Sequence, residues 1–401
     1  MIIPSKRSRD IEYAIRDVLV PAKRAEKKGK KIYYFNIGDP NKFDFETPEF
    51  MRKEMIRLMK EEKAGYYGDS QGDEELRETI VKRENRKNNL RLTHDDVVIT
   101  QGISEGINFL LGTLIEPGRG DEILMAGPAY PIYIQLSKFF GGVPVTYRSD
   151  EENRWDPDIE DLERKISEKT KAIVVINPNN PTGAVFSKES LKRIVKIAEE
   201  KELLLVTDEI YDQLIFSGKN SPGLASLAKN VSVIGLNGFS KSYLIPGWRM
   251  GYMYFHDPQE ILGELKNSIL KEARLRLSPS TPVMKACRVA YTGPQDHVKE
   301  TNKKLKRRAD FAYKRLNEID GISTQKPEGA FYIFPKVDLG DRWKNDKEFC
   351  LDLIKNTGVV FPYGSGFDEK YGKGHFRSVI LPPIEMMEEA FNKVDEFMMK
   401  S

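Results

Sequence analysis

Residues 172–211 read AIVVINPNNPTGAVFSKESLKRIVKIAEEKELLLVTDEIY. Within them, AIVVIN (172–177) is an apolar, β-branched run that predicts a buried strand. SLKRIVKIAEEKE (190–202) has apolar residues at helical spacing and predicts an amphipathic helix, and LLLVTD (203–208) predicts a second buried strand. A buried strand, a covering helix and another buried strand are typical of a parallel sheet.

The same pattern extends to both sides of this unit. Apolar runs predict further strands at DDVVIT (95–100), DEILMA (121–126), VPVTY (143–147) and VSVIGL (231–236). Helical stretches such as SEGINFLLGTLI (104–115) lie between several of them. We therefore expect an α/β protein whose mostly parallel sheet is covered by helices on both faces.

A change of pattern toward the C-terminus indicates a second, smaller domain. A long polar helix expected at about 295–318 precedes GAFYIFPKV (329–337), which has strand character. We assign residues 50–286 to a large domain, and residues 1–49 and 287–401 to a smaller α/β domain.

The charge balance and the cysteine count exclude several classes of partner. The 401 residues contain 64 Lys and Arg against 61 Asp and Glu, so no strongly basic surface for nucleic acid is expected. The two cysteines, Cys287 and Cys350, and the four histidines show no metal-ligand spacing, and we expect no metal. No apolar run has the length of a signal peptide or a membrane span, so we expect a cytoplasmic protein without a membrane partner.

Two loops directly follow expected strands, where ligands bind in open α/β sheets. TQGISEGI (100–107) predicts a helix start at which the N–H groups of Ile103 and Ser104 can hold a phosphate. On its own, an ordinary strand–helix turn is the more frequent explanation of that motif. In NPNNPTG (177–183), two Asn-Pro pairs restrict the backbone and can fix the Asn180 amide toward a ligand oxygen, although a simple turn explains the loop equally well.

An acidic residue ends the apolar strand LLLVTD. A carboxylate at this depth is costly unless it meets a cation or a strong donor, so Asp208 is a candidate partner for a positively charged ring nitrogen. Tyr211 follows three residues later and can reach the same ligand. The alternative is that Asp208 caps a following helix.

A lysine flanked by small and aromatic residues follows the last of these strands. NGFSKSYLIPGWRMGY (237–252) sets Lys241 among small and aromatic residues, with Arg249 eight positions later. A lysine of lowered pKa can form a Schiff base with an aldehyde, and an arginine can bind a phosphate through paired donors. Any single lysine is more often a surface residue, so the hypothesis depends on the whole set of loops.

An arginine near the C-terminus lies in an apolar run. FRSVILPP (376–383) places Arg377 where a cation needs a partner. That partner is either an internal Asp or Glu, which the residues alone favour slightly, or the carboxylate of a substrate.

Taken together, these motifs resemble one family. The chain contains, in order, NIGDP (36–40), GISE (102–105), NPNNPTG, DEIY (208–211), SKSYLIPGWR (240–249) and FRSVILPP. This combination resembles the fold-type I pyridoxal-phosphate enzymes, specifically the class I/II aminotransferases, over nearly the whole chain. NGFSKSYLIPGWRMG, INPNNPTGAVFSKE and KPEGAFYIFPKVD are most similar to the branch of microbial alanine (glutamate–pyruvate) aminotransferases.

The resemblance implies a fold and a cofactor. The fold would be aspartate-aminotransferase-like, with a mostly parallel seven-stranded sheet in the large domain, which would bind pyridoxal 5'-phosphate. Lys241 would bind the cofactor covalently and later transfer the substrate proton, and Asp208 would keep the pyridine nitrogen protonated. Asn180 and Tyr211 would donate hydrogen bonds to the phenolic oxygen of the ring, and Tyr130, in PAYPIY, would stack on it.

The resemblance also implies how the phosphate is held. The N–H groups of Ile103 and Ser104 and the side chain of Arg249 would contact it. Many members of the family place a serine three residues before the lysine for the same purpose, and here that position is Gly238. Ser240 is a candidate replacement, and other donors to the phosphate are the alternative.

Substrate and partner contacts follow from the same resemblance. Arg377 would bind the substrate α-carboxylate, with Asn180 and the Gly38 backbone close by. Tyr67, in GYYGDSQG, matches a tyrosine that reaches the phosphate of a neighbouring subunit, which implies a homodimer. Arg276, in RLRLSPSTP, lies where some members bind the distal carboxylate of a dicarboxylic substrate from across the dimer.

The expected activity is a ping-pong transfer of an amino group from an L-amino acid, alanine, to the 2-oxo acid 2-oxoglutarate. Alternatives on the same scaffold are an aminotransferase for aromatic, branched or 2-aminoadipate donors, and a carbon–sulfur β-lyase. A non-catalytic regulator with this fold is disfavoured, because such regulators add a DNA-binding module and few residues precede NIGDP.

Overall fold

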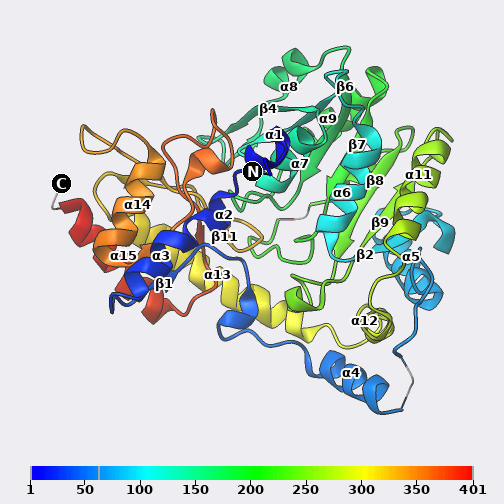
Figure 1. The fold of residues 1–401 in the computed structure, drawn as a ribbon, viewed down its shortest axis with the longest axis horizontal. Coiled ribbons are helices and arrows are strands. Elements are labelled where there is room, and N and C mark those ends of the chain that lie inside the picture. The colour runs from blue at the N-terminus through cyan, green and yellow to red at the C-terminus, as the bar shows by residue number, and fades with distance from the viewer. Residues whose placement is uncertain (1, 62–63, 220, 400–401) are drawn as a thin grey trace.

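The computed structural model describes residues 2–61, 64–219 and 221–399. Its largest element is an eight-stranded sheet in the order β2-β9-β8-β7-β6-β3-β4-β5 (Figure 1). Its strands are β2 (Val97–Thr100), β3 (Glu122–Gly127), β4 (Val143–Asp150), β5 (Asp156–Pro157), β6 (Thr170–Ile176), β7 (Leu204–Asp208), β8 (Val233–Gly238) and β9 (Gly251–His256).

The sheet is mostly parallel, as expected. β4, β3, β6, β7 and β8 run parallel to one another, β9 lies antiparallel between β2 and β8, and β5 is antiparallel to β4. All six strands expected from apolar runs are present, and β9 completes the seven that the family resemblance implies. The eighth, β5, has only two residues, too few to give a periodic signal.

Helices cover both faces of the sheet because its strands are apolar on both sides. One face packs against α6 (Ile103–Leu114), α7 (Pro131–Phe139) and α11 (Gly263–Leu275). The other packs against α5 (Glu74–Asn88), α8 (Ile159–Lys165), α9 (Lys188–Glu200) and α10 (Leu224–Leu227). Side chains of β7 alternate between these cores: Val206 faces α6 and Leu205 faces α9.

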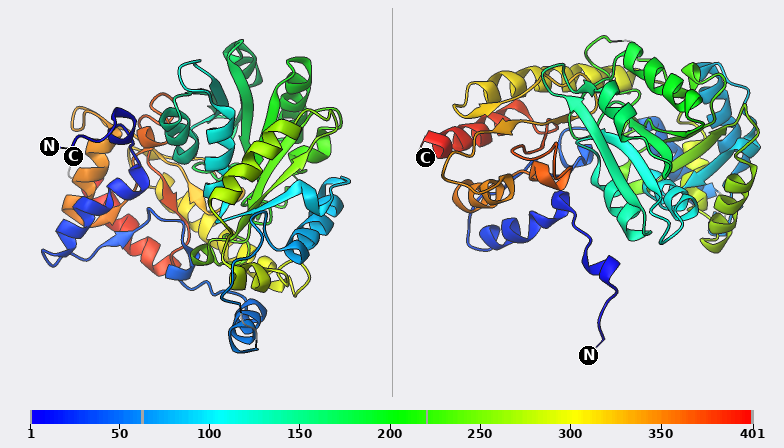
Figure 2. Two further views of the ribbon diagram at one scale, coloured as in Figure 1. Left: turned by 45° about the vertical axis from the view of Figure 1, so that its right-hand side comes forward. Right: turned by 90° about the horizontal axis from the view of Figure 1, so that it is seen from above.

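In the right-hand view of Figure 2, the start of the chain around α1 (Lys6–Arg9) extends away from the C-terminal segment. From α3 (Leu19–Glu26) onward, the N-terminal segment and the C-terminal segment lie side by side in both views. They are joined by a parallel pair, β1 (Tyr33–Tyr34) with β13 (Val359–Val360). The expected strand GAFYIFPKV is divided into β11 (Tyr332–Ile333), paired with β14 (Ser378–Val379), and β12 (Lys336–Val337), paired with β10 (Ile322–Ser323). The domain boundaries expected from the sequence stay a prediction.

The remaining helices surround these segments and the rim of the large sheet. They are α1 (Lys6–Arg9), α2 (Ala14–Asp17), α3 (Leu19–Glu26), α4 (Glu49–Glu61), α12 (Thr281–Cys287), α13 (Asp296–Asn317), α14 (Asp346–Thr357) and α15 (Ile384–Met399). Among the described residues, no helix combines the length and the apolarity needed to cross a bilayer.

Candidate active site

A cavity of about 530 Å³ lies at the carboxyl ends of the parallel strands, where the N-terminal segment meets the large sheet. Its size is that of a typical small-molecule site. It brings together side chains and backbone that are far apart in the sequence. Eleven residues expected in the site line it: Gly38, Ile103, Ser104, Tyr130, Asn180, Asp208, Tyr211, Ser240, Lys241, Arg249 and Arg377.

Lys241 lies in the turn after β8 and is partly buried. Its Nζ donates a hydrogen bond to the Gly38 carbonyl at 2.8 Å and lies 5.3 Å from the centre of the Phe331 ring. Burial lowers the pKa of Lys241 to about 8, against the opposing effect of the Asp39 carboxylate. The amine is therefore partly neutral, and nucleophilic, near neutral pH.

Asp208 is the last residue of β7 and is 1% exposed. Burial raises its pKa to about 7, although the Ile210 N–H and the Tyr133 hydroxyl both donate to the carboxylate. The Tyr133 hydroxyl lies 3.0 Å from Oδ2 and the Ile210 nitrogen 3.2 Å from Oδ1. Residues 210–213 form a turn, so the alternative that Asp208 caps a helix is wrong.

Arg377 is buried at another wall of the cavity. Its NH1 donates to Asn180 Oδ1 at 2.9 Å, its NH2 donates to the Asn36 carbonyl, and the guanidinium lies 4.4 Å from the centre of the Tyr332 ring. Its Nε has no partner among the described residues, and no carboxylate there pairs with it. The prediction that an internal Asp or Glu pairs with Arg377 was therefore wrong, and this cation is available for a ligand carboxylate.

Tyrosine hydroxyls join different parts of the cavity wall. The Tyr211 hydroxyl lies 2.8 Å from that of Tyr332, and the Tyr130 hydroxyl lies 3.1 Å from that of Tyr13 in the N-terminal segment. Because the Asn180 carbonyl oxygen already accepts from the arginine, its amide NH₂ is the group that can donate to a ligand.

One end of the cavity is suited to a phosphate. Ile103 and Ser104 lie in the first turn of α6, where N–H groups have no acceptor within the helix. A Cβ on Gly102 would lie 2.6 Å from the Arg249 NH2, and one on Gly251 would lie 2.7 Å from the Ile103 nitrogen. These two glycines let the backbone and the guanidinium converge on one small volume.

Gly238 departs from the family pattern for a steric reason. A Cβ at this position would lie 2.9 Å from the Gly251 Cα and 2.9 Å from the Met250 carbonyl oxygen. Since β9 passes so close, a serine does not fit there without displacing the strand. Ser240, which lines the cavity, is the hydroxyl present instead.

Comparison with known proteins identifies the family. The model of the family described as aminotransferase class I and II matches residues 30–394. The chain belongs to this family. This confirms the family prediction made from the motifs, and it agrees with a cavity lined by Lys241, Asp208 and Arg377.

Relatives with known names extend the comparison. The structure of an alanine aminotransferase from Pyrococcus furiosus is 53% identical, with both chains fully covered and a TM-score of 0.96. A glutamate–pyruvate aminotransferase AlaA from Haemophilus influenzae is 36% identical over 98% of each chain. A double mutant of Thermus thermophilus aspartate aminotransferase is 28% identical over 99% of this chain and all of that one, with a TM-score of 0.88. The aspartate-aminotransferase-like fold is therefore confirmed.

Two residues expected from the family pattern lie outside the cavity. Tyr67 is 81% exposed, and Arg276 pairs with Glu105 at 2.5 Å and donates to the Ser70 carbonyl at 2.8 Å. Both roles involve a second subunit, and both stay predictions.

Other lining residues were missed by the sequence analysis. Ile15 and the exposed Arg16 come from the N-terminal segment, and Asp39 directly follows the expected Gly38. The residues of α2 show no pattern tied to chemistry, so only the fold reveals them. Tyr133, which contacts Asp208 but does not line the cavity, was also missed, although it lies one helical turn after Tyr130 in PAYPIY and could have been found by that spacing.

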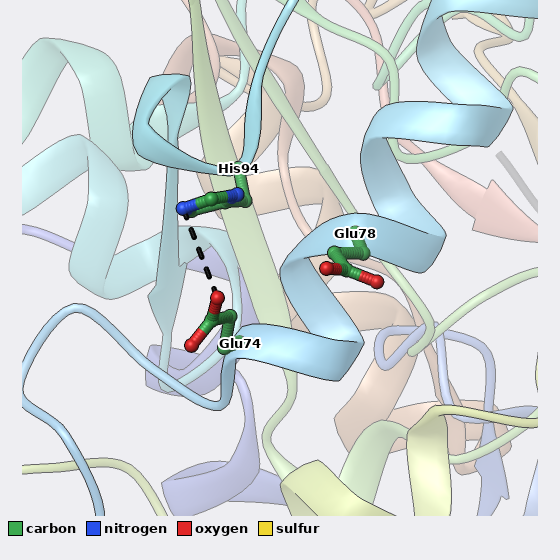
Figure 3. A group of neighbouring side chains, drawn as sticks. All are labelled: Glu74, Glu78 and His94. Carbon is green, nitrogen blue, oxygen red and sulfur yellow. Dashed lines mark ion pairs between the residues drawn. The ribbon is translucent and has the colours of Figure 1, made fainter.

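A separate group of possible metal ligands lies away from the cavity (Figure 3). Glu74 and Glu78 of α5 and His94 have ligand atoms within 4.8 Å of one another. Both glutamates are exposed, and His94 Nε2 lies 3.9 Å from Glu74. Such an arrangement is common at solvated surfaces, and we assign it no function.

Proposed function

We propose that the chain is a pyridoxal-phosphate-dependent aminotransferase that transfers the amino group of alanine to 2-oxoglutarate by a ping-pong mechanism. The observation that carries this proposal is the convergence of Lys241, Asp208 and Arg377 on one cavity in a class I/II aminotransferase. The names of the Pyrococcus and Haemophilus relatives support alanine and glutamate as the donors.

The residues of the cavity fit the proposed cofactor. The first turn of α6 and Arg249 would hold its phosphate, with the Ser240 hydroxyl nearby. Asp208 would pair with its ring nitrogen, and Lys241 would bind its aldehyde carbon. When bound, pyridoxal phosphate supplies a cationic conjugated ring that accepts the electron pair left at the substrate Cα.

Lys241 performs the proton transfer in this proposal. Because burial lowers its pKa to about 8, its Nζ can be neutral when it takes the proton from the substrate Cα. The same Nζ would then deliver that proton to C4′, the former aldehyde carbon of the cofactor. Asp208 remains ionised when a protonated ring nitrogen lies beside it, because an opposite charge favours the carboxylate.

Arg377 orients the substrate. Its paired N–H groups suit the α-carboxylate that both amino acids and 2-oxo acids carry, so one arginine serves both half-reactions. Ile15, Ile37 and Tyr13 line the cavity and offer apolar surface for the methyl group of alanine.

Arg16 is the group that we assign to the distal carboxylate of glutamate and 2-oxoglutarate. It is exposed at the surface and lines the cavity from the same chain, unlike Arg276, which already pairs with Glu105. Alanine and pyruvate have no distal carboxylate. In this proposal Arg377 binds every substrate, and Arg16 binds only glutamate and 2-oxoglutarate.

The active unit in this proposal is a homodimer. Tyr67 is exposed, as are the large apolar side chains Ile56 and Met59 of α4, which precede it. An exposed apolar group of this kind is typical of an interface. Tyr67 would reach the phosphate bound in the second subunit, and Arg276 stays the alternative for the distal carboxylate.

A donor panel tests the proposed function. Purified holoenzyme is mixed with alanine, glutamate, aromatic, branched and 2-aminoadipate donors, and the absorption of the bound cofactor is followed. Bleaching by alanine and glutamate supports the proposal. Bleaching by an aromatic donor but not by alanine would overturn the substrate assignment, and pyruvate with ammonia from a cysteine conjugate would indicate a β-lyase.

A further inference from the structure

A cluster of buried ionisable side chains lies behind the cavity. It consists of Arg83, Glu84 and Lys87 of α5 and of Glu209 and Asp212, which follow β7. Arg83 donates to Glu84 and to Asp212. The Lys87 Nζ lies 2.7 Å from Glu209 Oε2 and 2.5 Å from Asp212 Oδ2. We call these five residues the α5 ion cluster.

The α5 ion cluster and the cavity lie on opposite faces of the sheet. Along β7, Val206 packs in the core that contains α6, and Leu205 packs in the core that contains α5. Since side chains alternate along a strand, Asp208 continues on the face of the cavity. Glu209 continues on the opposite face, where Lys87 meets it.

The turn after β7 connects the two sides. Ile210 and Tyr211 line the cavity, whereas Asp212 points back into the α5 ion cluster. Asp212 also accepts a hydrogen bond at 3.1 Å from the side chain of Asn237, which lies in β8 four residues before Lys241. The Asp212 carboxylate therefore connects the turn with α5, through Arg83, and with the end of β8, through Asn237.

Burying the α5 ion cluster costs desolvation free energy that apolar residues in the same place would not cost. Its three acids and two bases are largely withdrawn from water, and apolar packing usually stabilises as well as a buried ion pair does. Although burial opposes ionisation, Arg83 and Lys87 lower the pKa of Asp212 to about 2, so this carboxylate remains charged. Several directional bonds to one charged group fix a geometry more tightly than apolar contact does.

We propose that Asp212, held by Arg83 and Lys87, is a positioning residue for the amino-transfer reaction. It holds the turn so that Asp208 and Tyr211 face the cavity, and through Asn237 it fixes the strand end that leads to Lys241. This inference rests on the proposed function, because it assigns the α5 ion cluster a role in orienting the same cofactor. None of the five residues lines the cavity, so each acts only through other residues.

The test compares Lys87→Met with Lys87→Arg in the full-length holoenzyme. Lys87→Met removes one cation from Asp212 and should lower kcat by about 100-fold, the effect of a small misplacement of reacting groups. Its KM for alanine should stay within about two-fold, since Arg377 does not contact the cluster. The visible circular dichroism of the bound cofactor, which reports the orientation of its ring, should weaken. Lys87→Arg keeps the charge and should recover both signals.

The matched control is Arg315→Met. Arg315 pairs with Asp395 at 2.6 Å in a largely buried bridge between α13 and α15, away from the cavity. It should lose stability but keep kcat and the cofactor signal. A wild-type kcat and cofactor signal in Lys87→Met would overturn the inference, as would an equal loss in Arg315→Met. If Lys87→Met does not fold, Asp212→Asn keeps the size and one acceptor, and a wild-type kcat and cofactor signal in that variant would overturn the inference equally.

This design separates the inference from the proposed function. The circular dichroism of the bound cofactor needs no substrate, so it reads the positioning role even if alanine is not the donor. If the wild-type enzyme rejects alanine, the proposed donor is wrong, and the kcat comparison is made with the donor that does bleach the cofactor.

Discussion

Replacing Tyr133 by phenylalanine removes the only side-chain donor to Asp208 among the described residues. The hydroxyl lies 3.0 Å from Oδ2, and both side chains are buried. A hydrogen bond to a charged group contributes about 1.5–3 kcal/mol, and one pKa unit corresponds to about 1.4 kcal/mol. Because this bond favours the carboxylate, Tyr133→Phe should raise the pKa of Asp208 from about 7 to about 8 or above.

The consequence is measured as cofactor affinity. If ionised Asp208 pairs with the ring nitrogen, a higher pKa means that binding also has to remove a proton. Titration of the apoprotein with pyridoxal phosphate at neutral pH should then show affinity reduced by about 5-fold or more. The control is Tyr147→Phe, because Tyr147 is equally buried but its hydroxyl has no hydrogen-bond partner among the described residues. Equal affinity in Tyr133→Phe and wild type would refute this account of Asp208.

Three further substitutions test other parts of the site. Arg16→Gln should raise KM for 2-oxoglutarate by about 10-fold or more and leave KM for alanine unchanged; equal changes for both substrates would contradict the assignment. The folded apoprotein holds the Asp208 proton more tightly than the unfolded chain does, with a pKa of about 7 against 3.8, so this residue lowers stability as pH rises through that interval. Asp208→Asn should therefore raise the free energy of unfolding of the apoprotein at pH 8, by up to about 4 kcal/mol in urea denaturation. A lower free energy of unfolding in this variant would contradict the conclusion that Asp208 lowers stability. Gly238→Ser should destabilise the protein by about 1–3 kcal/mol in thermal unfolding because of the contact with β9. An unchanged melting temperature would show that β9 shifts to accommodate the serine and would contradict the steric explanation.

The sequence was sufficient to predict most of the cavity, for a physical reason. Parallel strands between helices end at one edge of a sheet, so residues that directly follow such strands meet there. Ser104, Asn180 and Lys241 each follow an expected strand, Asp208 ends one, and all four line the cavity. Chain order and periodicity contain the information needed for that inference.

Other parts of the site depend on contacts that periodicity does not encode. Arg377 is held by an amide oxygen, a backbone carbonyl and aromatic faces, and nothing in FRSVILPP distinguishes these partners from a carboxylate. The pairing of Arg83 with Asp212 joins residues 129 positions apart. Arg16 reaches the cavity only because the N-terminal segment folds back over it. Such contacts follow from the packing of whole elements, which one sequence does not reveal.

The central claim is that Lys241 moves the proton that lets alanine give up its amino group to the cofactor, and a half-reaction without any 2-oxo acid tests it most directly. Wild-type holoenzyme mixed with alanine should release about one pyruvate for each bound cofactor and then stop, because the cofactor keeps the amino group. Lys241→Ala should release none on the same time scale. Absence of pyruvate from the wild type, or an equal burst from Lys241→Ala, would contradict the account.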